Sequence, residues 1–467
     1  MPAADIPRDT RSATSGINRS CHHGNSTRGR LSVVLRNVVG GLESDMMEGT
    51  TACWMNRKEF FDSPKGKVHL FRQRKLERFC ACFRDVEPQS KKSMKEANKD
   101  LPQRLVMKAL EEAKQPTYRG PIALEIELAT TSKTPPHAQT IAKNLIDLLK
   151  ALLYRDDNQI HALSVSCRHG QAHPYISIHS RRFSSALKDL EVAAEALHSA
   201  GGAWSQLHDE ELDEDWIGTI DRFKDLIKNE QRSRAALGDA LYESLFKMTR
   251  WSAQRQLLKR SRITTAELAQ LYRLPKNPSS EQLYSQWNHF FQNHPLRVTL
   301  SELPQTHGSD SFKRAIDAEV AKFKKRYDWI IRPLVVSVAL EVIVRPFPSM
   351  PRGSIKDLDN MVRDYLLPKF VPAFGTASHY SWTIDFDELA RRAPELRRHW
   401  GDKRTPPKGT RDGVTRYEVW LLPPASDGSE VFVSVALVTD ELDRSVFRQI
   451  DDQVSRWETE LEENMLS

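Results

Sequence analysis

Two segments of the chain repeat one order of predicted elements, and this repeat limits the possible fold more than any other feature. Residues 103–184 predict a helix, an alternating strand, a second helix and two strands joined by a polar turn. Residues 330–440 predict a strand, a Pro/Gly-rich loop, a helix, a long loop and two further strands. Helices combined with hairpins are typical of α+β proteins. The 467-residue chain is therefore expected to contain two similar α+β units.

Three further segments complete the predicted organisation. Residues 1–102 lack a sustained period, apart from a strand pattern over residues 31–39 and a basic helical run over residues 68–83. Residues 1–100 hold 19 Lys+Arg against 12 Asp+Glu, whereas the rest of the chain is balanced. This head is expected to be basic and largely irregular, as either an electrostatic arm for nucleic acid or a solvated tail. Residues 185–329 have mostly helical periods and form a predicted insertion between the units. Residues 441–467 predict a charged C-terminal helix.

Composition excludes several classes of protein. The sequence has no run of eighteen apolar residues, and its first thirty residues lack the apolar stretch of a secretory signal. Five cysteines are too few and too scattered for a disulfide framework. These features predict a soluble, cytoplasmic protein that does not contact membranes.

The acidic stretch "KDLDN", residues 356–360, stands at the start of the helix in the second unit. In an extended segment, residues i and i+2 project to one side, so Asp357 and Asp359 can aim both carboxylates at one cation. The alternative is that they stabilise the helix N-terminus as caps. When Lys143 is aligned with Arg363, the first unit has His137 and Gln139 where the second has these two aspartates.

The two units together resemble the RusA-like Holliday junction resolvases. That family combines an apolar strand, a DxDN motif opening a helix, a lysine four positions after the second aspartate, an aspartate pair after the helix, and a closing hairpin. The second unit matches in Asp357, Asp359 and Asn360, but has Arg363 in the position of the lysine. The first unit matches in "AKNLIDLLKALLYRDDNQI", through Lys143, Asp147, Asp156, Asp157, Gln159 and Ile160.

The resemblance implies a metal-dependent endonuclease that cuts branched DNA, such as a four-way junction, in recombination or repair. It implies an internal pseudo-dimer in a chain that can act as a monomer. It also implies a set of site residues. The metal ligands are Asp357, Asp359 and Asp412, with Asp156 and Asp157 as secondary candidates and with Asp385 and Asp387 competing with Asp412. The resemblance further implies that Arg363 is a catalytic cation beside the three catalytic aspartates, and that the substrate-binding residues are Asn360, Lys143 and Arg155.

Magnesium is the expected cofactor. Phosphodiester hydrolysis needs a hard cation that neutralises the transition state and lowers the pKa of the attacking water. Carboxylate oxygens suit Mg²⁺. Because the motif is divided between the units, a rival interpretation is an inactive RusA-like protein that binds DNA junctions or acts as a scaffold. A third is a resemblance in topology alone.

Overall fold

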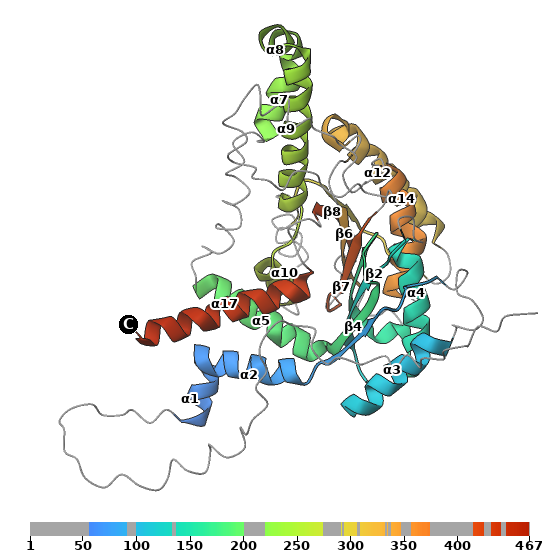
Figure 1. The fold of residues 1–467 in the computed structure, drawn as a ribbon, viewed down its shortest axis with the longest axis vertical. Coiled ribbons are helices and arrows are strands. Elements are labelled where there is room, and N and C mark those ends of the chain that lie inside the picture. The colour runs from blue at the N-terminus through green and yellow to red at the C-terminus, as the bar shows by residue number, and fades with distance from the viewer. Residues whose placement is uncertain are drawn as a thin grey trace, which may run out of the picture.

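The computed structural model describes most residues of the two repeated segments (Figure 1). The described residues are 56–90, 100–132, 137–199, 220–273, 291, 294–305, 309–331, 334, 338–346, 356–373, 414–424, 431–439 and 445–466. The predicted strand near residues 31–39 and the candidate ligands Asp385, Asp387 and Asp412 lie outside these ranges.

The core of the protein is one mixed eight-stranded sheet in the order β1-β4-β2-β3-β7-β6-β8-β5. One half of the sheet comes from the first part of the chain and the other half from the second. The strands are β1 (Phe79–Arg84), β2 (Ile122–Ala129), β3 (Ile160–Arg168), β4 (Tyr175–Arg182), β5 (Arg297–Leu300), β6 (Val338–Arg345), β7 (Arg416–Leu421) and β8 (Phe432–Thr439). The mixed sheet with packed helices confirms the α+β class.

The pattern of parallel and antiparallel strand pairs is the same when it is followed from either edge of the sheet. In each half a parallel pair, β2–β3 or β6–β7, is flanked by an antiparallel strand, β4 or β8, and then by a short antiparallel edge strand. The halves join where β3 and β7 pair antiparallel. In this pairing Ser164 lies opposite Glu418, Leu163 opposite Val419 and Val165 opposite Tyr417.

This register defines a pseudo-twofold axis through the Ser164–Glu418 pair. Stepping outward from the axis, Glu125 of β2 matches Glu341 of β6, because each pairs with the central residue of its own half. The next positions are His179 and Ala436, followed by Cys80 and Arg297 at the edge strands. Equivalent residues can therefore be compared directly between the two halves.

Helices cover both faces of the sheet (Figure 1). One face carries α3 (Asp100–Ala113), α4 (Ala138–Leu149), α9 (Asp239–Arg260), α12 (Asp310–Ile331) and the segment α13 (Leu358–Met361), η3 (Val362–Leu366) and α14 (Leu367–Ala373), which pack around a large apolar core. The other face carries α2 (Pro64–Leu76), α5 (Phe183–Ser199), α10 (Thr265–Arg273) and α17 (Val446–Leu466). The short helices α1 (Arg57–Asp62), α7 (Ile220–Lys228) and α8 (Glu230–Leu237) complete the described helices of the chain.

The expectation that residues 1–102 are largely irregular is wrong for residues 57–84. They form α1, α2 and β1, and the predicted helical run over residues 68–83 ends at Leu76. From Phe79 onward the side chains alternate, with Phe79, Ala81 and Phe83 buried in the core and the residues between them on the opposite face. A period of two cannot continue a helix, so the chain becomes an edge strand.

The segment 185–329 is mostly helical where it is described, but it is not only helical. It contributes β5, which pairs with β8 at the edge of the second half-sheet. In the described part of the chain no helix is long and apolar enough to cross a membrane.

Candidate active site

The acidic stretch of the second half lies where the chain enters α13. Asp357 is the residue before the first helical residue, as His137 is for α4, in agreement with the alignment of the two units. The Asp357 side chain makes no hydrogen bond to the helix N–H groups. Instead its Oδ2 accepts a hydrogen bond from Asn360 Nδ2 at 3.1 Å. The interpretation of Asp357 as a side-chain cap is therefore wrong.

Asp359 is the more deeply placed of the two aspartates. It lies in the first turn of α13, and only 4% of its surface is exposed. Its Oδ1 is buried and has no hydrogen-bond partner within the described ranges. Because burying a carboxylate oxygen without a donor is costly, Oδ1 is suited to accept a cation or a hydrogen-bond donor that the described residues do not supply.

A third aspartate reaches this position from the first half. Asp157 opens a short 3-10 turn, η2 (Asp157–Gln159), directly before β3, and is 6% exposed. Its Oδ1 is also buried without a hydrogen-bond partner among the described residues. Because β3 is the strand at the junction of the halves and α13 packs against it, Asp157 and Asp359 meet across the pseudo-twofold axis.

Lys143 of α4 connects the two aspartates. Its Nζ lies 3.0 Å from Asp359 Oδ2, 3.5 Å from Asp157 Oδ2 and 3.0 Å from Asp147 Oδ1. The lysine that the first half retains is thus beside the aspartate that the second half retains. Sequence comparison alone did not predict this pairing, although the complementary losses in the two units are a signal for it.

Burial and mutual repulsion disfavour the charged form of the carboxylates in this group. Burial raises the pKa of Asp157, and the carboxylates of Asp359 and Asp357 raise it further against the effect of Lys143. Burial and then Asp359 likewise raise the pKa of Asp357. Burial lowers the pKa of Lys143, but Asp359 and Asp147 outweigh this effect and raise it above the usual value. A neighbouring cation, such as the Lys143 ammonium, stabilises the charged carboxylates against this effect.

Other predicted site residues lie near the cluster but point elsewhere. Arg363 is in the π-helical turn η3 and binds the neighbouring Asp364, with Nε–Oδ1 at 2.7 Å and Nη2–Oδ2 at 3.0 Å. Arg155 is exposed, and its backbone N–H donates to Gln159 Oε1 at 2.7 Å. Asp156 is exposed as well and accepts from Asn158 Nδ2 at 3.1 Å. The structure also adds Lys150, whose Nζ lies 3.5 Å from Asp156 Oδ1 and 3.9 Å from Asp157 Oδ2.

Among the described residues, no three His, Cys, Asp or Glu side chains come together as a complete metal site. The predicted convergence of Asp357, Asp359 and Asp412 stays a prediction because Asp412 lies outside the described ranges. Mg²⁺, however, commonly uses only one or two protein carboxylates and completes its shell with water and substrate phosphate. The two orphaned Oδ1 atoms of Asp157 and Asp359 fit that pattern.

Comparison with known proteins gives no further guide. The chain matches no family model, no curated protein and no solved structure.

Proposed function

We propose that the chain is a Mg²⁺-dependent, structure-selective DNA endonuclease of the RusA-like kind, with one active site assembled from both halves. The observation that carries this proposal is the meeting of Lys143 and Asp157 of the first half with Asp359 of the second. Each half lacks part of the family motif, and the two retained parts complement each other at the pseudo-twofold axis.

The residues around the cluster support specific roles. Asp157 and Asp359, with Asp357 beside them, would hold the cation through their Oδ1 atoms. When bound, the cation supplies neutralising charge to the scissile phosphate and acidifies an attacking water. Asn360 orients the Asp357 carboxylate through the hydrogen bond at 3.1 Å. Lys143, which the aspartates keep charged, would contact a phosphate oxygen where negative charge develops. Arg363 would add positive charge after leaving its contact with Asp364.

One observation favours an inactive, junction-binding protein instead. The Lys143 ammonium already lies between Asp157 and Asp359, where it neutralises charge that a metal would otherwise neutralise. If this ion pair is permanent, the cluster is structural and the protein binds DNA without cutting it. Replacing Lys143 separates the two functions, because a structural ammonium affects stability and a catalytic one affects rate.

The test is cleavage of a four-way DNA junction by the wild-type protein and by Asp359→Asn with Mg²⁺. We expect the variant to lose cleavage by at least about 100-fold, as is usual when a group that stabilises the transition state is removed. Asp317→Asn, which removes an exposed carboxylate of α12, serves as the control and should cleave normally. Lys143→Gln should also lose cleavage while its melting temperature still responds to Mg²⁺.

Absence of cleavage by the wild-type protein with any divalent cation, combined with normal junction binding, would favour the inactive alternative. Absence of both binding and cleavage would reject the proposed function.

A further inference from the structure

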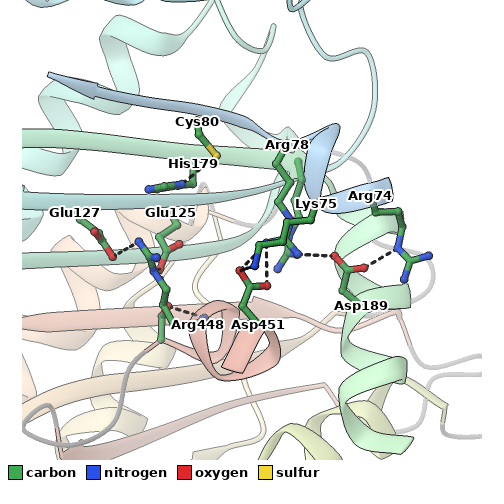
Figure 2. Close-up of polar contacts among 12 residues, drawn as sticks. Arg74, Lys75, Arg78, Cys80, Glu125, Glu127, His179, Asp189, Arg448 and Asp451 are labelled. Atoms are coloured by element: carbon green, nitrogen blue, oxygen red, sulfur yellow. Dashed lines mark hydrogen bonds and ion pairs between the residues drawn. The ribbon is translucent and has the colours of Figure 1, made fainter. Parts of the chain in front are cut away.

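A cavity lies on the opposite face of the sheet from the carboxylate cluster. It has a volume of about 300 Å³ and lies between α2, α17 and strands β1, β2 and β4. This volume is at the lower end of the range for small-molecule sites. Figure 2 shows the side chains around it: Cys80 and His179 on the strands, Lys75 from α2, Arg78 from the turn between α2 and β1, and Arg448 and Asp451 from α17.

The strand wall of this cavity carries a thiol next to an imidazole. Cys80 of β1 is exposed and pairs with His179 of β4 in the strand register, and its Sγ lies 3.2 Å from His179 Nδ1. The other ring nitrogen, Nε2, lies 2.8 Å from Ser177 Oγ. When Nε2 carries the proton and donates to Ser177, Nδ1 is oriented to accept the thiol proton. Cys80, His179 and Ser177 thus form a linked set of nucleophile, base and orienting group.

The cavity wall supplies more positive than negative charge, because Lys75, Arg78, Arg181 and Arg448 line it together with Glu125 and Asp451. Asp189 alone accepts hydrogen bonds from Arg74, Arg78 and Arg181, at 2.6, 3.0 and 2.6 Å. Asp451 is shared by Arg78, at 2.8 Å, and Lys75, at 3.8 Å. Two carboxylates therefore serve four cations, of which Lys75, Arg78 and Arg181 line the cavity.

The buried cations of this wall show the effect of that imbalance. Burial, followed by repulsion from Arg78, lowers the pKa of Arg181 to about 10. The Nε atom of Arg78 is buried and lacks a hydrogen-bond acceptor among the described residues. Both features favour an anion in the cavity.

The other half of the sheet lacks this arrangement. The positions equivalent to Cys80 and His179 are Arg297 and Ala436. Arg297 pairs with Glu341 and donates to Ser434 Oγ at 3.0 Å, so a structural ion pair stands where the first half has a thiol and a base. The thiol–imidazole pair is therefore not a requirement of the sheet architecture.

We propose that Cys80 is a nucleophilic thiol that exchanges with small anionic disulfides bound in this cavity. His179 takes the thiol proton, and the Cys80 thiolate forms a bond to one sulfur of the bound disulfide. The disulfide S–S bond breaks, and the second sulfur leaves as a thiolate that receives the proton from His179. The product is a mixed disulfide on Cys80, and the lining cations hold the acidic groups of the ligand.

The experiment measures the reaction of the folded full-length protein with two disulfide probes by stopped-flow absorbance. 5,5'-Dithiobis(2-nitrobenzoate) carries two carboxylates, and 2,2'-dithiodipyridine carries none. With the anionic probe we expect the protein to show a fast phase. Its rate constant should be at least about tenfold higher than that of the reference thiol N-acetylcysteine with the same probe, because adjacent cations and a base favour attack by the thiolate. Cys80→Ser should lose this phase. Cys82→Ser, two residues along the same strand, should keep it, and peptide mass mapping should locate the adduct on Cys80.

Two further pairs of measurements test the base and the cationic wall. His179→Gln should slow the fast phase about tenfold with both probes while circular dichroism shows an intact fold. Lys75→Gln should slow only the anionic probe, whereas Lys58→Gln on the exposed helix α1 should slow neither. A fast phase that persists in Cys80→Ser, or a Cys80 rate equal to that of N-acetylcysteine, would overturn the proposal. Equal effects of Lys75→Gln on both probes would overturn the preference for anions.

Discussion

Two adjacent aspartates show how environment assigns different roles to the same side chain. Asp157 is buried, lies against Lys143 and has an unpartnered Oδ1 among the described residues. Asp156 is 56% exposed, and Asn158 and Lys150 contact its carboxylate. A sequence containing two consecutive aspartates does not say which one faces the site. The 3-10 turn before β3 decides it, because it directs Asp157 inward.

The adjacent pair therefore provides a matched test of the site. We expect Asp157→Asn to lower the rate of junction cleavage by about 100-fold, because it removes a carboxylate that would hold the cation. Asp156→Asn removes an equal charge one residue away and should change the rate only a few-fold. Rates are measured under single-turnover conditions with each protein in excess over the junction. Equal losses in the two variants would show that the total negative charge of this region, and not the position of Asp157, supports activity.

At the scale of elements, strand β2 and helix α17 meet through a buried carboxylate. Glu125 Oε1 accepts a hydrogen bond from Ser445 Oγ at 2.5 Å, and Arg448 Nε lies 3.9 Å from the same oxygen. Burial and then repulsion from Glu127 raise the pKa of Glu125 to about 7, against the usual 4.5. The contact between sheet and helix is consequently sensitive to pH.

The sign of this effect follows from the direction of the shift. Since the folded pKa is raised, the stabilising contribution is complete below about pH 4.5 and is lost as the pH rises through 7. The loss is at most about 3 kcal/mol, given 1.36 kcal/mol for each pKa unit. Glu125→Gln should remove that part of the pH dependence. Urea denaturation at pH 5 and pH 8 measures the change in the free energy of unfolding. Glu111→Gln on α3 is the control for removal of an exposed carboxylate.

If wild-type and Glu125→Gln proteins lose the same free energy of unfolding between these pH values, Glu125 is not the titrating group at this contact.

The elements that sequence reasoning predicted are those with strong local patterns. Strands β2, β3, β6, β7 and β8 have dense apolar or alternating residues, and α4 and α17 have clear helical periods, so local sequence determines their type. The strands it missed are the two edge strands. β1 follows a basic helix without a turn signal, and β5 has only four residues.

The candidate site was predicted only in part because it depends on contacts between distant segments. Asp357 and Asp359 were identified from their spacing and Asn360 from the family resemblance, and their helix begins as expected. The approach of Lys143 and Asp157 to Asp359 follows from the edge-to-edge pairing of β3 with β7, which joins residues far apart in the sequence. No local pattern encodes that pairing, so the sequence left the first half as a secondary site.

At the scale of the whole molecule, the two half-sheets are related by a pseudo-twofold axis within one chain. The candidate site uses both halves once, with Lys143 and Asp157 from one and Asp357 and Asp359 from the other. A second, symmetric site would need carboxylates at the positions of the first half that correspond to Asp357 and Asp359, but these hold His137 and Gln139. One chain is therefore expected to carry one cation site.

This arrangement predicts the behaviour of mixed variants. Because both sets of ligands come from one chain, an equimolar mixture of Asp157→Asn and Asp359→Asn should remain inactive in junction cleavage. In a site built between two identical chains, the same mixture would contain some intact sites and regain activity. The measurement compares the mixture with each variant alone at matched total protein. Recovered cleavage would show that the site forms between separate chains.

The residue pair on the pseudo-twofold axis also determines which surfaces can associate. Glu418 is buried opposite Ser164, where Trp420 Nε1 and the Val446 N–H donate to its carboxylate and Arg262 lies 3.7 Å away. A second copy of the C-terminal half that docked through β7 would place its own Glu418 directly opposite. Two buried like charges at facing positions destabilise a strand pair. The asymmetric pair on the axis thus disfavours homotypic assembly through β7 and selects the edge of β3, held on the same chain, as the partner of β7.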